Sequence, residues 1–259
     1  MKLKRLLKSL AIALVCAILI FCLLAKDKYV VPIMMYHHVS DNLLPKNLNV
    51  VEEKTFEYHM LYLKKHGFHV IGLDELVEGI QHKRKFHSKT VVITFDDGYG
   101  NNFSHAFPIL KKYQFPATIF VISDLVGKTG YLTWPQMKEM MGQGISFGSH
   151  TRWHAYLPDL NEDNLKNEIK ISKSIIEQNL GQPIKYFSYP AGGFTENIKN
   201  LVHESGYIAA CTTNRGQVKS NQDLYELKRI RFNEDDYGLS LWAKLSGYYN
   251  LFRKVTKPN

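Results

Sequence analysis

The chain has 259 residues, of which 45% are hydrophobic and 22% are charged, so it can bury a core and is neither disordered nor collagen-like. Its three cysteines are too few for a small domain held together by disulfides. The formal net charge of +9 is uneven, because residues 1–28 carry +5 and residues 29–259 carry only +4. So modest a charge on the larger part indicates no nucleic-acid partner.

The first 28 residues have the pattern of a membrane-targeting segment. Ser9–Ala25 is an uncharged, mostly aliphatic run that follows a cluster of basic residues. As a helix it would be about 25 Å long, slightly shorter than a hydrocarbon core of about 30 Å. It fits either a cleaved signal peptide or an uncleaved anchor.

Cleavage requires small residues before the cut, and Leu23 occupies one of those positions if the cut follows Ala25. We therefore favour a single N-terminal transmembrane helix within residues 1–28. The basic cluster would keep the N-terminus inside the cell, which places residues 29–259 outside the cytoplasm as an extracellular domain at the cell membrane. If the leader is cleaved, this domain is secreted.

The remaining chain alternates short apolar segments with amphipathic ones. The segments expected to form strands are Val30–Tyr36, His69–Ile71, Thr90–Phe95, Ala117–Ile122, Ile145–Gly148, Lys185–Tyr189, Tyr207–Cys211 and one within Leu227–Phe232. The expected helices are Thr55–His66, Asp74–Ile80, Asn102–Lys112, one that begins at a Thr133 capping box, Asn161–Leu180, Thr195–Glu204 and Leu239–Leu245.

This alternation predicts an α/β fold, an irregular or incomplete (β/α) barrel with about seven parallel strands, preceded by one N-terminal transmembrane helix. Residues 29–259 would form a single domain.

Polar residues gather where three of the expected strands end. The strand Thr90–Phe95 runs into Asp96 and Asp97, whose side chains would point to opposite sides of the strand. One could therefore bind a metal and the other could face a reacting water molecule. Taken alone, Asp-Asp-Gly is equally compatible with a turn that caps the next helix.

The strand Ile145–Gly148 runs into a sequence that contains His150 and His154. Two histidines four residues apart in a helical turn face the same side, which is a common arrangement for zinc. With eleven histidines in the chain, such a pair also arises by chance. Combined with a strand-end aspartate, the pair becomes a candidate His₂Asp metal site with open positions.

The strand Lys185–Tyr189 runs into Pro190-Ala191-Gly192-Gly193. This is either an ordinary turn between a strand and a helix or a loop whose backbone N–H groups stabilise an oxyanion. Because active sites of parallel α/β folds lie at the carboxyl ends of strands, the convergence of three such clusters favours a catalytic site.

Three motifs then carry a specific resemblance. Thr94–Tyr99 (TFDDGY), Ser149–His154 (SHTRWH) and Ser188–Gly193 (SYPAGG) resemble the first three motifs of the polysaccharide deacetylase family, the NodB-homology group of carbohydrate esterase family 4. Met35–Ser40 and Ala117–Gly127 are also similar to that family. The motifs resemble most closely the branch that deacetylates poly-N-acetylglucosamine and related cell-surface polymers.

The resemblance implies a hydrolase that removes N-acetyl groups from an acetylated glycan. It implies that Asp97, His150 and His154 are the metal ligands, for Zn²⁺ or another divalent ion such as Co²⁺ or Ni²⁺, and that Asp96 is the general base for a metal-bound water. It also places the N–H of Ala191 at the oxyanion, with Tyr189 and Pro190 shaping the pocket and Trp153 lining the groove.

The sequence departs from the family pattern in two places. Ser188 stands where many relatives have an arginine that orients the base, and we expect Arg229 or Arg231 to supply that charge from another strand. The usual C-terminal Leu-x-His acid is absent, and His37 or His38 is the expected substitute, with His37 preferred.

These departures leave other functions open. One alternative is a catalytically weak polysaccharide-binding module that keeps the deacetylase fold. Another is deacetylation or ester cleavage on xylan or on a substrate that is not a glycan, which no residue excludes.

Overall fold

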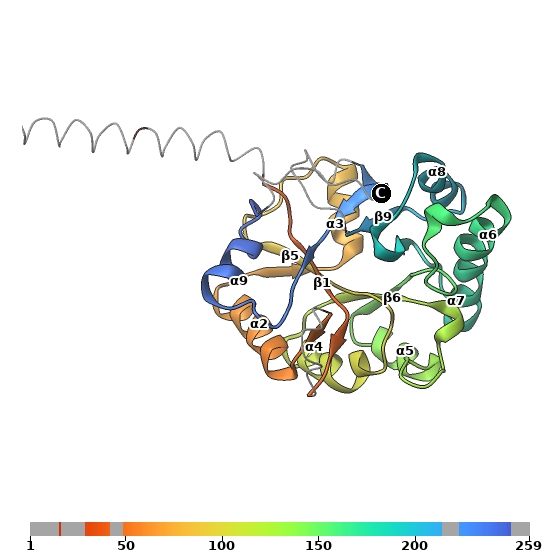
Figure 1. Cartoon of the computed structure of the whole chain (residues 1–259). Helices are drawn as coiled ribbons and strands as arrows, with labels where there is room; N and C mark the ends of the chain where they lie inside the picture. Colours follow the sequence, from red (N-terminus) through yellow and green to blue (C-terminus); the bar gives the residue numbers. More distant parts are fainter. Residues whose placement is uncertain (1–15, 17–28, 42–48, 214–222, 250–259) are drawn as a thin grey trace, which may run out of the picture.

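Parallel strands surrounded by helices form the protein in the computed structural model, which describes Cys16 and residues 29–41, 49–213 and 223–249 (Figure 1). Its strands are β1 (Ile33–Tyr36), β2 (His38–Val39), β3 (Val50–Val51), β4 (His69–Ile71), β5 (Thr90–Phe95), β6 (Ala117–Val121), β7 (Ile145–Ser149), β8 (Tyr186–Ser188), β9 (Ala209–Thr212), β10 (Leu227–Lys228) and β11 (Ile230–Arg231).

The α-helices are α2 (Glu53–Lys65), α3 (Leu73–Gln81), α4 (Phe107–Tyr113), α5 (Trp134–Met141), α6 (Glu162–Lys166), α7 (Ser172–Leu180), α8 (Glu196–Glu204) and α9 (Gly238–Leu245). Shorter helical turns are η1 (Asn102–Ala106), η2 (Ser123–Leu125), η3 (Leu157–Asp159), η4 (Asn167–Ile171), η5 (Pro190–Gly192) and η6 (Leu224–Glu226).

The main sheet is a nearly closed barrel in which every strand pair is parallel. Its strands run in the order β10-β9-β8-β7-β6-β5-β1-β11, and β4 adds to β5. β10 and β11 are parts of one extended segment, because Leu227 pairs with Cys211 of β9 and, after Arg229, Ile230 pairs with Met34 of β1. This segment therefore bridges the two edges of the sheet, and Arg229 lies at the point where it changes partner.

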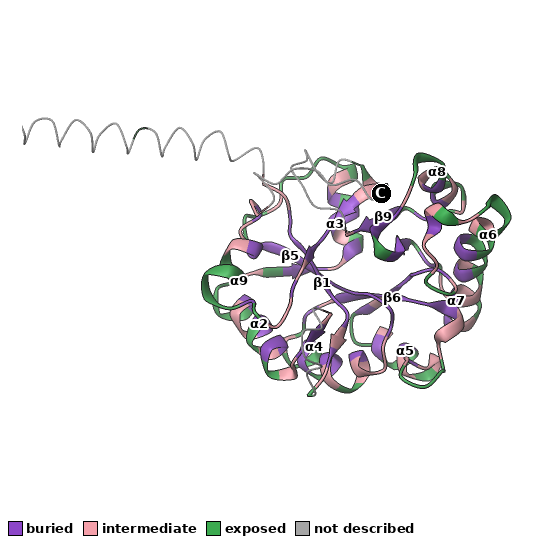
Figure 2. Cartoon of the chain, in the orientation of Figure 1, coloured by how far each residue is buried: buried purple, intermediate pink, exposed green. Residues whose placement is uncertain are grey.

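The apolar residues divide into two cores according to the two faces of the strands. Ile33, Val92, Phe120, Tyr186 and Cys211 belong to one cluster of buried side chains inside the barrel. Neighbouring strand residues pack outward against the helices in a second, larger cluster. Figure 2 shows that the strands are buried and that exposed residues are concentrated on the outer helices.

Helix α3 covers the end of the barrel at which the strands begin. Its residues Leu73, Leu76 and Val77 belong to the interior cluster. Asp74, in its first turn, accepts hydrogen bonds from Lys185 and from the Tyr186 hydroxyl, at the start of β8. The opposite end of the barrel, where the strands finish, is therefore the end that can hold a site open to substrate.

The α/β barrel of parallel strands predicted from the sequence is confirmed, with about eight strands when β4 is included instead of about seven. The Thr133 capping box is present, and the helix expected over 161–180 is continuous through α6, η4 and α7. The short sheet formed by β2 and β3 was not predicted. Cys211 fills a buried position in β9.

The predicted N-terminal transmembrane helix lies outside the described residues, apart from Cys16. Within the described part of the chain, no helix combines the length and the apolar character that a membrane span needs.

Candidate active site and metal centre

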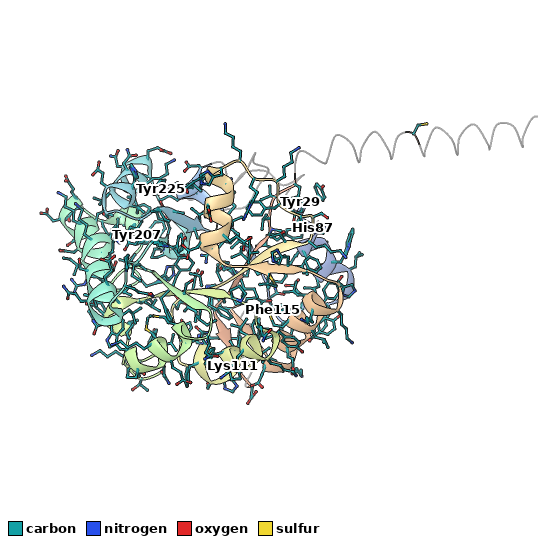
Figure 3. The ribbon with its side chains drawn as sticks, turned by 180° about the vertical axis from the view of Figure 1, so that it is seen from behind. Tyr29, His87, Lys111, Phe115, Tyr207 and Tyr225 are labelled. Atoms are coloured by element: carbon teal, nitrogen blue, oxygen red, sulfur yellow. The ribbon has the colours of Figure 1, made fainter. Side chains whose placement is uncertain are left out.

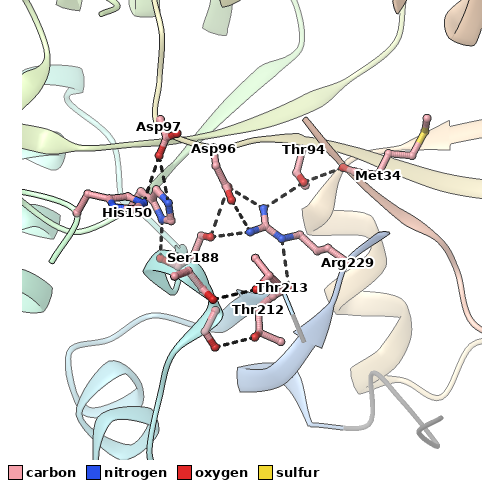
Figure 4. Close-up of polar contacts among 12 residues, drawn as sticks. Met34, Thr94, Asp96, Asp97, His150, Ser188, Thr212, Thr213 and Arg229 are labelled. Atoms are coloured by element: carbon pink, nitrogen blue, oxygen red, sulfur yellow. Dashed lines mark hydrogen bonds and ion pairs between the residues drawn. The ribbon is translucent and has the colours of Figure 1, made fainter. Parts of the chain in front are cut away.

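The three strand-end clusters meet at one end of the barrel. Asp96 and Asp97 follow β5, His150 follows β7, and Ser188 is the last residue of β8. The strands are parallel and joined through β6, so their carboxyl ends lie on the same side. Figure 4 shows Asp96, Asp97, His150 and Ser188 close to one another, although almost 100 residues separate the first from the last.

Asp97, His150 and His154 form a group that could hold a metal ion. The Nε2 atoms of His150 and His154 lie 3.4 Å and 3.5 Å from the Oδ1 atom of Asp97. Direct hydrogen bonds would be shorter, at about 2.7–3.2 Å. Two ligand atoms on a tetrahedral zinc ion, each about 2.0–2.1 Å from it, lie about 3.3 Å apart. The observed spacing therefore fits a shared cation better than it fits direct pairing.

The hydrogen bonding of this group also fits a metal ion. Asp97 is buried, yet its Oδ1 atom has no hydrogen-bond partner, which is costly unless a cation occupies that position. The Nδ1 atom of His150 is 2.8 Å from the carbonyl oxygen of Ser188, which can only accept, so Nδ1 carries the proton. The lone pair of His150 is thereby left on Nε2, the atom that faces Asp97.

The loop that carries the two histidines differs from the predicted helical turn, and that prediction was wrong. Thr151 and His154 have φ angles of +68° and +61°, so the segment is not helical. The Thr151 hydroxyl oxygen accepts a hydrogen bond from the N–H of His154, which holds the loop in this shape. Burial, and then the neighbouring His150, lower the pKa of His154, which keeps its imidazole neutral and able to bind a metal.

Asp96 is paired with Arg229 inside the barrel (Figure 4). Two nitrogens of Arg229, Nη1 and Nη2, donate to Oδ1 and Oδ2 of Asp96 at 2.7 Å and 2.6 Å. The same Nη2 donates to the hydroxyl of Ser188 at 2.8 Å, and this hydroxyl donates to Asp96 at 3.4 Å. All three side chains are buried. Arg229, which comes from the segment that closes the barrel, therefore lies where the sequence led us to expect a replacement for the missing arginine.

The arginine decides the charge of Asp96. Burial alone would raise the pKa of this carboxyl group, but the charge of Arg229, aided by His150 and His37, holds the pKa well below its ordinary value. Asp96 is consequently ionised at every physiological pH. A bidentate arginine also fixes the direction of the carboxylate, so a water molecule near the metal group would meet a charged oxygen acceptor.

His37 and His38, the two candidates for the missing acid, have different surroundings. His37 is buried directly after β1, and burial lowers its pKa to about 4 although the charges of Asp96 and Asp97 oppose that shift. His38 is half-buried, pairs with Asn101 at 3.0 Å and stacks on Tyr99 with 3.5 Å between ring centroids. His37 is therefore the one of the two whose pKa is influenced by both aspartates, and among the described residues no aromatic ring stacks on it.

The turn after β8 brings its backbone to the same end of the barrel. Ala191 is exposed and has a φ angle of +53°. Gly192 has a φ angle of +76°, and a Cβ atom there would lie 2.1 Å from the Thr213 hydroxyl oxygen, so only glycine fits. Pro190 is buried, and so is the ring of Tyr189, whose hydroxyl donates to the carbonyl of Tyr225. The Tyr189 ring thus belongs to the core and does not face solvent.

Trp153 and Glu168 relate differently to the loop that carries His154. Trp153 is 55% exposed, so its indole is available at the rim of the site. Glu168, from η4, is buried, and its Oε2 atom accepts hydrogen bonds from the N–H groups of Arg152 and Trp153 at 2.9 Å and 3.0 Å. Glu168 was not singled out from the sequence. The available signal was its place on the buried face of the long helix, next to Ile169, where an acidic residue needs a partner.

A second group of potential metal ligands, Asp41, Glu53 and His105, does not share these features. The Nδ1 atom of His105 lies 2.5 Å from a carboxylate oxygen of Glu53, which is a direct hydrogen bond. Asp41 is 69% exposed and 3.8 Å from the same nitrogen. This group is accounted for by a hydrogen bond between His105 and Glu53 near the surface.

Comparison with known proteins agrees with this geometry. A family model described as polysaccharide deacetylase matches residues 83–210. YxkH of Bacillus subtilis, which is named for a polysaccharide deacetylase, is 37% identical over 212 residues, covering 82% of this chain and 75% of that protein. The poly-beta-1,6-N-acetyl-D-glucosamine N-deacetylase of Staphylococcus epidermidis is 28% identical over 206 residues, covering 74% and 71%.

A solved structure is similar over almost its whole length. The deacetylase PplD of Streptococcus pyogenes, in complex with acetate, superposes with a TM-score of 0.78 at 30% identity, covering 84% of this chain and 99% of that one.

Proposed function

Because the chain belongs to the polysaccharide deacetylase family, we propose that it removes N-acetyl groups from an N-acetylglucosamine-containing polysaccharide of the cell surface or cell wall, and that it does so with a divalent metal ion. The observation that carries this proposal is the meeting of Asp97, His150 and His154 at metal-ligand spacing directly beside the ionised Asp96. The N-deacetylase name of the staphylococcal relative supports the choice of substrate.

In this proposal Asp97, His150 and His154 hold the metal ion, which would be Zn²⁺ or another divalent ion such as Co²⁺ or Ni²⁺. When bound, such an ion supplies Lewis-acid activation of water and of an acetyl carbonyl group. The Ser188 carbonyl fixes the ring of His150, and Glu168 fixes the loop that presents His154, so the ligands are held in place by the fold.

Asp96 acts as the general base and accepts a proton from the attacking water. Arg229 keeps this carboxylate charged and directed, and Ser188 adds a hydrogen bond to the same group. Arg229 is a positioning residue, because it acts through Asp96.

The N–H of Ala191 would stabilise the oxyanion that develops when the amide carbon is attacked. Pro190 fixes the backbone direction at that turn, and the exposed Trp153 offers an aromatic face to a sugar ring. The buried Tyr189 supports the turn from the core instead of touching substrate.

The leaving amine must take up a proton, and His37 is the proposed donor. With a pKa of about 4 its imidazole is neutral in the resting site, so it must first receive the proton that Asp96 takes from the attacking water and then pass that proton to the amine. Replacing His37 with Ala should lower acetate release by about 10²–10⁴-fold and leave the metal content unchanged. Equal acetate release by His37→Ala and the wild type would show that another residue is the general acid.

We further propose that residues 1–28 anchor the protein in the cell membrane as a single span, with residues 29–259 forming an extracellular catalytic domain. The proposal is supported by the uncharged run Ser9–Ala25 and by the basic residues that precede it. Cleavage of the leader would release the same domain.

Acetate release from N-acetylglucosamine oligomers, measured with and without a chelator, tests the activity. We expect release that stops on chelation, returns with Zn²⁺ and is lost in Asp96→Asn although this variant still binds the metal. A protein that binds both metal and oligomer but releases no acetate would instead be a polysaccharide-binding module. Equal release by Asp96→Asn and the wild type would refute the assigned base.

A further inference from the structure

A surface formed by basic residues lies at the end of the barrel opposite the active site. The segment 82–89, which leads into β5, contains Lys83, Arg84, Lys85 and Lys89 and no acidic residue. Lys64 and Lys65 at the end of α2 adjoin it, because the Lys89 ammonium donates to the carbonyl of His66. We call these six residues the basic patch.

The basic patch is accessible and only partly neutralised. All six residues are exposed. Arg84 pairs with Glu75 at 3.1 Å, an exposed pair. Among the described residues, Lys64, Lys65, Lys83 and Lys85 have no carboxylate within salt-bridge distance, although Glu78 is exposed nearby on α3. The patch therefore keeps most of its positive charge free to attract an anionic surface.

The patch is next to the point where the N-terminal segment meets the domain. The hydroxyl of Tyr29 donates to the carbonyl of Thr90, the residue that follows the segment 82–89. Figure 3, which shows the domain from behind, has Tyr29 and His87 side by side. Only residues 26–28 separate Tyr29 from the apolar run Ser9–Ala25, and three residues span at most about 10 Å.

We propose that the basic patch binds the anionic phospholipid headgroups of the membrane and thereby holds the active site facing away from the bilayer. This inference rests on the anchor proposed above. Because only three residues separate Tyr29 from the proposed span, and Tyr29 contacts Thr90 next to Lys89, the patch lies on the side of the domain that faces the membrane, where anionic headgroups attract Lys and Arg. β5 separates the patch from Asp96, and its six residues extend over about 20 Å. The site would thus open toward a polymer outside the membrane.

The test uses the full chain in phosphatidylcholine vesicles with and without phosphatidylglycerol. An amine-reactive reagent labels exposed lysines, and mass spectrometry gives the labelling rate at each position. We expect labelling of Lys83, Lys85 and Lys89 to slow several-fold in the anionic vesicles only, and 0.5 M NaCl (about 4 Å screening length) to abolish the difference. Lys138 and Lys170, which are exposed on other helical segments, should label at the same rate in both vesicles.

A matched pair of variants separates the patch from general charge. Lys65→Gln/Lys85→Gln removes two charges from the patch, which should weaken headgroup binding about 30-fold, at about fivefold for each charge. Labelling of the remaining Lys83 and Lys89 should then be alike in the two vesicles. Lys138→Gln/Lys170→Gln removes the same charge elsewhere and should leave the protection of Lys83 and Lys89 intact.

Other outcomes are distinguishable. Flotation of the chain with both vesicles, with equal labelling of the patch in each, overturns the headgroup surface but keeps the anchor. Flotation with the anionic vesicles alone would support headgroup binding by the basic patch and refute the membrane anchor. Flotation with neither kind of vesicle would refute both the headgroup binding and the anchor. Protection by soluble polyglycerol phosphate without protection by vesicles would assign the patch to an anionic polymer and overturn the membrane proposal.

Discussion

Replacing Arg229 with Gln would leave the carboxylate of Asp96 buried without its cation. In the native protein two short hydrogen bonds, at 2.7 Å and 2.6 Å, join the two groups, and both side chains are almost fully buried. Removing one partner of a buried ion pair typically costs about 3–5 kcal/mol, because the remaining charge is uncompensated. We expect the free energy of unfolding to fall by that amount at neutral pH.

The loss should depend on pH. In the native protein the pKa of Asp96 is lower than in the unfolded chain, so its ionisation stabilises the fold above about pH 4, and this contribution disappears as the pH falls through the lowered pKa. Without Arg229, burial would raise the pKa of Asp96 above its unfolded value. The variant should then lose stability as the pH rises through that raised pKa, so the two proteins should differ least in acid and most at neutral pH.

Two assays examine this prediction, urea unfolding at several pH values and the pH profile of acetate release. The acid limb of the profile should move to higher pH in Arg229→Gln, because the base must be ionised to accept a proton. Arg84→Gln breaks the exposed pair with Glu75 and should change the free energy of unfolding by at most about 1 kcal/mol. Adding Asp96→Asn to Arg229→Gln should restore part of the lost stability. An unchanged acid limb together with unchanged unfolding would refute the reasoning.

Three further substitutions test the supports of the site. Asp97→Asn should weaken zinc binding, measured by competition with a chelating dye, by more than the roughly 10–100-fold expected for an outer-shell residue. Glu168→Gln should lower zinc affinity by about tenfold in the same assay, because a neutral amide accepts hydrogen bonds from the two loop N–H groups less strongly than a carboxylate does. Unaltered zinc affinity would show that Glu168 does not position the metal ligands. Gly192→Ala should destabilise the fold by at least about 1 kcal/mol, whereas Gly142→Ala, with a φ angle of −64° and only an ordinary contact at 3.5 Å, should be nearly neutral in thermal unfolding.

Much of the site could be predicted because each motif directly follows a buried strand. The apolar, β-branched run of Thr90–Phe95 identifies β5, and the carboxyl ends of parallel strands lie together, so Asp96 and Asp97 had to share one end of the barrel with His150. The position of Arg229 could be learned only from the structure. A sequence does not show that a short segment changes partner from β9 to β1, and that change places its middle residue inside the barrel beside Asp96.

The backbone conformation of the loops could not be predicted from the sequence, and the physical reason for this also supports the assignment of the site. Six non-glycine residues in the described part of the chain have positive φ angles, and four of them, Asp97, Thr151, His154 and Ala191, are at this end of the barrel. Such conformations cost about 1–3 kcal/mol each and persist only where the surrounding structure enforces them. Local propensity predicts the cheaper helical turn at His150–His154, which is why that prediction failed. A fold that holds strained residues in three separate loops, all converging on one buried carboxylate, maintains a geometry that its own stability does not require.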